Sequence, residues 1–110
     1  MATTSYKVLG QLNPSATTAT TLYTVPASTS AVVSTLSIAN QAAASATFRV
    51  AIRPAGATLD PKHYIVYGAT VPANDSTFLT LGLSLATTDV ITVYASSATL
   101  SFNVYGTEIA

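Results

Sequence analysis

The segment from Asp60 to Tyr64, Asp-Pro-Lys-His-Tyr, holds the densest group of polar side chains in the sequence. A carboxylate and an imidazole three residues apart could begin a metal site or an acid/base pair. A zinc site needs three or four protein ligands, however, and His63 is the single histidine of a chain without cysteine. We therefore interpret the segment as a loop that enters a strand, and we expect no metal and no cofactor.

The other three carboxylates offer no converging pair. Asp75 and Asp89 each follow a turn-like segment and are expected to begin strands, while Glu108 is expected to lie in the C-terminal tail. Serine is abundant, but the chain has no Gly-x-Ser-x-Gly motif and no glycine-rich phosphate loop. The sequence therefore predicts a protein that is not an enzyme.

Two of the four cations, Arg49 and Arg53, are four residues apart in an alternating segment and are expected on the same face of a strand. Two interpretations stay open: a pair that binds carboxylates of another subunit, or a solvated face kept soluble by two charges. The six tyrosines, at positions 6, 23, 64, 67, 94 and 105, are further interface anchors. The interface candidates are Arg49, Arg53, Asp60, Lys62, His63 and Tyr64.

The composition is notable for its lack of charge. Only 7% of residues are charged, against about 25% in an ordinary soluble domain, and the formal net charge is zero. Binding to nucleic acid or to an acidic membrane surface needs a basic surface, which this chain does not offer. No apolar run reaches the roughly 18 residues of a membrane span, and the start MATTSYKVLG does not resemble a signal peptide. We expect neither nucleic acid nor membrane as a partner.

Apolar residues alternate with small polar ones through most of the chain, which is typical of strands with one buried face. Strands are predicted near 6–12, 20–25, 31–40, 46–54, 62–67, 75–86 with a break at Gly82, 89–95 and 99–106. Residues 49, 51 and 53 are expected to face outward. The predicted core between two sheets is Phe48, Val50, Ile52, Leu79, Leu81, Ile91, Val93, Leu100, Phe102 and Val104.

Turn residues separate these segments at intervals of about 8 to 14 residues, a spacing typical of antiparallel sandwiches and barrels. Gly68 and Gly106 are among the residues expected in turns. We predict a single all-β domain over residues 1–110, an antiparallel β-sandwich of eight to nine strands, Ig-like or jelly-roll-like, with a short polar N-terminal arm at residues 1–5.

Several strings in the sequence resemble small virion structural proteins of tailed bacteriophages, particularly those of marine and cyanobacterial hosts. They are LYTVPA at 22–27, VVSTL at 32–36, ATFRVA at 46–51, RPAG at 53–56, HYIVY at 63–67 and SFNVYG at 101–106. The resemblance covers nearly the whole chain and consists of strand and turn strings. It implies a β-sandwich attached to a head, tail or fibre, located in the virion and assembled in the host cytoplasm.

Composition and resemblance together suggest a capsid decoration or cement protein that binds the shell and stabilises it. Its expected partner is the major capsid protein or another virion protein, and it is expected to self-associate, with a trimer as the favoured state. The alternative is a tail, baseplate or fibre module that recognises a host surface glycan. Such a module should show a groove lined by tyrosine or another aromatic residue, with carboxylates or amides nearby, and in this sequence the acidic residues are dispersed.

Overall fold

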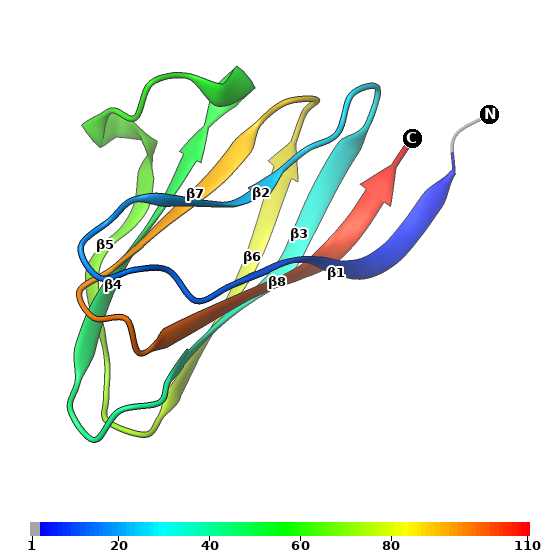
Figure 1. Cartoon of the computed structure of the whole chain (residues 1–110). Coiled ribbons are helices and arrows are strands. Elements are labelled where there is room, and N and C mark those ends of the chain that lie inside the picture. Colours follow the sequence, from blue (N-terminus) through cyan, green and yellow to red (C-terminus); the bar gives the residue numbers. More distant parts are fainter. Residues whose placement is uncertain (1–2) are drawn as a thin grey trace.

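The computed structural model describes residues 3–110, which form two four-stranded antiparallel sheets packed face to face (Figure 1). Sheet A has the order β1-β8-β3-β6, and sheet B has the order β2-β7-β4-β5. The strands are β1 (Thr4–Leu12), β2 (Thr20–Thr24), β3 (Ser30–Asn40), β4 (Ala46–Arg53), β5 (Tyr64–Val71), β6 (Ser76–Leu85), β7 (Val90–Ala95) and β8 (Leu100–Ile109), with 3-10 turns η1 (Pro54–Gly56) and η2 (Pro61–His63) before β5. The predicted all-β sandwich is confirmed, with eight strands over these residues.

The two sheets are held together by the apolar side chains that alternate along their facing sides. Phe48 of β4 and Phe102 of β8, the two largest fully buried side chains, meet edge to face with ring centroids 6.2 Å apart. Leu36 of β3 lies opposite both Leu79 of β6 and Val104 of β8 in the register of sheet A. Burial of such side chains is the main favourable contribution to folding.

The predicted core agrees closely with the buried one. Seven of its members are buried, and Ile52 and Leu79 are partly buried against them. The side chain of Leu81 lies outside the described part of the molecule. The seven buried members are Phe48, Val50, Ile91, Val93, Leu100, Phe102 and Val104.

Strand β5 differs most from its predicted limits. It starts at Tyr64 rather than near residue 62, because Pro61–His63 form η2, and it runs on through Gly68 to Val71. Gly68 is not a turn residue but an extra residue within the strand: Phe48 pairs with Ala69 and Arg49 with Tyr67. Its φ of +76° suits this bulge, since glycine adopts positive φ without steric cost.

Gly106 also lies inside a strand. Strand β8 continues past it to Ile109. Glycine is required here by packing rather than by a turn, because β3 approaches so closely that a side chain on Gly106 would overlap the carbonyl of Val32. The extended β8 pairs with Thr4 and Ser5, so these residues of the expected N-terminal arm belong to β1. The remainder of that arm includes residues 1–2, which lie outside the described residues.

Strand β6 is continuous from Ser76 to Leu85, so it does not end at Gly82. Its pairing with β3 is nevertheless irregular at this point: Val33 pairs with Leu83 and Thr35 with Thr80, so residues 81 and 82 of β6 lie opposite a single residue of β3. Because of this irregularity, both halves of β3 keep their apolar residues on the inner side: Ala31 and Val33 before it, and Leu36 and Ile38 after it.

Replacing Val50 with Asp should unfold the domain. Val50 is fully buried on β4, and a carboxylate there would have no partner in the apolar layer, at a cost of several kcal/mol. Thermal unfolding followed by circular dichroism measures the effect. Thr70→Asp, at an exposed position on neighbouring β5, is the matched control and should melt within a few degrees of the wild type. A Val50→Asp protein with the wild-type melting temperature would contradict the described packing.

Candidate functional site

An arginine enclosed by tyrosines lies on the outer side of sheet B. Arg49 of β4 is in register with Tyr67 of β5 and with Tyr94 of β7. Its Cζ atom lies 4.2 Å from the ring centroid of Tyr67 and 4.1 Å from that of Tyr94, so the guanidinium is held between two aromatic rings. Cation–π contacts of this kind are favourable and fix both partners in place. We call Arg49, Tyr64, Tyr67 and Tyr94 the tyrosine–arginine cluster.

The arrangement depends on a second bulge in β5. Residues three apart on a regular strand point to opposite faces, which would separate Tyr64 from Tyr67. Val50 pairs with Val66 and Ala51 with Tyr64, so Ile65 is an extra residue that brings both tyrosines to the outer face. Their rings meet edge to face, with centroids 5.0 Å apart and planes at 88°.

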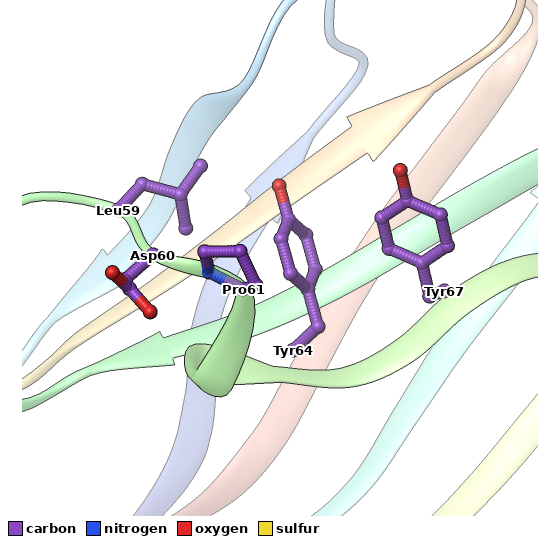
Figure 2. A pocket seen from close by; sticks show the side chains of 5 residues that line it. All are labelled: Leu59, Asp60, Pro61, Tyr64 and Tyr67. Atoms are coloured by element: carbon purple, nitrogen blue, oxygen red, sulfur yellow. The ribbon is translucent and has the colours of Figure 1, made fainter.

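The two tyrosines form one side of a hollow of about 580 Å³, which is also lined by Leu59, Asp60 and Pro61. Figure 2 shows the two rings side by side with their hydroxyl groups pointing the same way, Pro61 beside Tyr64, and Leu59 and Asp60 beyond it. The volume lies within the roughly 300–1,000 Å³ that is usual for small-molecule sites. The hollow combines apolar walls with two hydroxyls and one carboxylate.

The 60–63 segment has a structural role that fixes the edge of this hollow. One carboxylate oxygen of Asp60 accepts a hydrogen bond from the backbone N–H of Lys62 at 3.2 Å. The backbone N–H of Asp60 donates to Nδ1 of His63 at 3.0 Å, and the histidine is buried. These reciprocal bonds form a capping box for η2. His63 thus holds the loop, and residues 3–110 contain no cluster of three metal-ligating side chains.

Lys62 and Ala51 differ in their exposure to solvent. Lys62 is exposed and lines a separate hollow of about 490 Å³ together with Ile52 and Ile65. Ala51 points outward on β4 as predicted, yet it is fully buried. It lies in register between Thr92 and Tyr64, and these larger neighbours cover its methyl group.

Arg53 does not share the role of Arg49. Its Nε donates to Oγ1 of Thr92 at 3.0 Å, and its Nη1 donates to the carbonyl of Ala57 at 3.0 Å. The side chain therefore fastens the turn after β4 to the surface of sheet B. For Arg49, the contacts found within residues 3–110 are aromatic, and no carboxylate there lies within ion-pair distance of it.

A network of polar side chains joins the two sheets at the end where the termini lie. Glu108 accepts a hydrogen bond from the hydroxyl of Tyr23 at 2.5 Å and forms an ion pair with Lys7 at 2.6 Å. Glu108 was expected in a tail, but it lies in β8, because the strand extends beyond Gly106. The contacts with Lys7 and Tyr23 lower the pKa of Glu108, and burial with the neighbouring Glu108 raises the pKa of Tyr23. The network is a structural link rather than an acid/base pair.

The other two acidic residues have the turn roles that the sequence predicts. Asp75 accepts the backbone N–H of Ser76 at 2.7 Å. Asp89 accepts the N–H of Ala86 at 2.8 Å and that of Ala55 at 2.9 Å, so it joins the β6–β7 turn to η1. Both carboxylates therefore stabilise chain reversals.

The outer face of sheet A has a different character. Its strands contain two charged residues, Lys7 and Glu108, and their contacts with each other and with Tyr23 place both on the side towards sheet B. The outward rows are made of hydroxyl, amide, aromatic and aliphatic side chains. We call this surface the neutral face; its most exposed large apolar residues are Tyr6 at 84%, Phe78 at 68%, Val8 at 47%, Val32 at 40% and Ile109 at 36%.

The structure therefore brings some of the predicted interface candidates together and separates others. Arg49, Asp60 and Tyr64 lie at or beside the hollow, whereas Arg53 and His63 hold loops. Sequence reasoning named Tyr67 and Tyr94 only as possible anchors and missed their contact with Arg49, since strand pairing decides it. Comparisons of the chain with known protein families and with curated proteins found no match.

Stability should decline at both extremes of pH, with Glu108 and Tyr23 responsible. The pKa of Glu108 is lowered by folding, so its contribution is present above the unfolded pKa of about 4.3 and is lost as the pH falls through the folded pKa. The pKa of Tyr23 is raised, so its contribution is lost as the pH rises above about 10.

Urea unfolding between about pH 2 and pH 7 should show a smaller acid-dependent loss for Glu108→Gln than for the wild type, because that variant has no carboxylate to protonate at this position. Thr70→Ser, an exposed substitution on β5 that changes no titratable group, is the control and should keep the wild-type profile. Equal acid profiles for the wild type and Glu108→Gln would show that the network does not contribute as described.

Proposed function

We propose that the protein is a non-enzymatic structural protein of a phage virion, and that it acts as a capsid decoration protein. The observation that supports this most is the neutral face, a broad side of the sandwich that presents exposed aromatic and aliphatic side chains without charge. Exposed apolar surface of this kind is typical of sites where proteins bind one another. The phage-like sequence strings suggest a virion protein as the partner.

In this proposal the neutral face lies against the major capsid protein, or another protein of the shell, and copies of the chain bridge neighbouring subunits. The added contacts stabilise the shell against internal pressure. Binding through shape, apolar contact and hydrogen bonds explains why a chain with zero net charge can attach. Self-association as a trimer is part of the same proposal, because virion lattices offer threefold positions.

A second candidate function is recognition of a host surface glycan by a tail, baseplate or fibre module. The hollow beside Tyr64 and Tyr67 favours it, since it combines aromatic walls with the carboxylate of Asp60. Copy number separates the two locations. A decoration protein should approach the abundance of the major capsid protein in purified virions, whereas a baseplate or fibre protein should be far less abundant.

The attachment surface can be tested by removing the protein from virions and adding variants back. Tyr6→Ser combined with Phe78→Ser should weaken rebinding by at least about tenfold, because two exposed aromatic contacts of the neutral face are lost. Occupancy is measured by quantitative gel analysis at several salt concentrations. Wild-type binding should change little with salt, since screening acts mainly on exposed charges.

Arg49→Ala is the matched control on the opposite outer face, and it should rebind like the wild type. It also tests the sequence-based expectation that the attachment surface includes the Arg49/Arg53 face or the 55–64 connection. Loss of rebinding in Arg49→Ala, with full rebinding of the Tyr6/Phe78 variant, would move the attachment surface to sheet B and overturn this assignment. Light scattering of the free protein tests the trimer, and a clean monomer at high concentration would contradict it.

A further inference from the structure

We infer that the hollow between Tyr64, Tyr67 and Pro61 binds the pyranose ring of a neutral glycan. This inference rests on the second candidate function and deepens it by naming the class of sugar, and it concerns the face of the sandwich that points away from the neutral face. It does not require attachment to a virion, and it can be tested on the isolated protein.

The shape and chemistry of the walls suit a sugar ring. A pyranose has a face of C–H groups, which packs well against an aromatic ring, and an edge of hydroxyl groups, which need hydrogen-bond partners. Tyr64 and Tyr67 supply two rings with planes at 88°, so a sugar that lies flat on one ring has the other at its edge. Their hydroxyl groups point to the same side and can both donate and accept hydrogen bonds (Figure 2).

The exposed ring of the site is fixed before any ligand arrives. Tyr67 is 65% exposed, and a side chain this exposed would ordinarily lose rotational freedom when it binds. Here Arg49 lies 4.2 Å from its ring centroid, and Arg49 is itself held by Tyr94 at 4.1 Å. A wall that is already ordered reduces the entropic cost of binding. Arg49 is therefore a positioning residue for Tyr67.

The charge of the lining favours a neutral sugar over an acidic one. Asp60 is the one charged residue among those that line the hollow. Its carboxylate accepts the N–H of Lys62 as part of the capping box of η2, and carboxylate oxygens have lone pairs for further hydrogen bonds. The carboxylate can therefore accept hydrogen bonds from sugar hydroxyls, whereas it would repel the carboxylate of an acidic sugar.

Saturation-transfer NMR on the isolated protein provides the test, because it detects weak binding. The probes are the methyl glycosides of glucose, galactose, mannose and N-acetylglucosamine, with N-acetylneuraminic acid as the acidic comparison. At least one neutral probe should bind the wild type. Tyr64→Ala and Tyr67→Ala should each lower its affinity by about tenfold or more. Arg49→Gln keeps both rings but removes the contact that orders Tyr67, so it should lower the affinity less.

Tyr6→Ala is the matched control, since it removes an even more exposed tyrosine from the neutral face, and it should bind like the wild type. Melting temperatures of all variants should remain close to that of the wild type, because each substituted side chain lies outside the core. The inference would be overturned if no neutral probe binds, if affinity survives both Tyr64→Ala and Tyr67→Ala, or if the acidic probe binds more tightly than the neutral ones. Each result is independent of whether the protein attaches to a shell.

Discussion

Every other feature of this molecule depends on the apolar contact between its two sheets, in which Phe48 and Phe102 are the largest fully buried side chains. The chain has no cysteine for disulfide links, and charged residues are 7% of the sequence, so packing must supply most of its stability. Because the inner sides of all eight strands are committed to this layer, the functional side chains are found on the two outer faces and in the loops. The polar link among Lys7, Tyr23 and Glu108 joins the sheets at one end without interrupting that layer.

The strands could be predicted from sequence because one buried face produces a period of two, and this pattern survives along most of the chain. The inward positions of Phe48, Val50 and Phe102 follow directly from it. What the pattern does not reveal is where a strand takes an extra residue. Gly68 and Ile65 are both extra residues in β5, and the bulge at Ile65, rather than alternation, brings Tyr64 and Tyr67 to the same face.

The candidate site was predictable only in part for the same reason. Arg49 could be placed on an outer face by counting, but its contacts with Tyr67 and Tyr94 depend on which strands are neighbours and on their register. Alternation also places Arg53 on the outer face. Its side chain nevertheless binds a loop, because the turn after β4 brings the carbonyl of Ala57 within hydrogen-bond distance. Glu108 was misplaced because Gly106 permits close packing of β3 and β8 instead of ending the strand.

The two outer faces differ in a way that suggests a division of roles. The neutral face is broad and without charge, which suits contact with another protein surface, while the tyrosine–arginine cluster borders a hollow suited to a small polar ligand. A sandwich presents these faces in opposite directions, so one can attach while the other remains accessible. Electron cryomicroscopy of particles that carry the protein tests this arrangement most directly. The account predicts that Tyr6 and Phe78 are buried against the shell while Tyr64 and Tyr67 face solvent, and a map in which sheet B lies against the shell and the neutral face is exposed would contradict it.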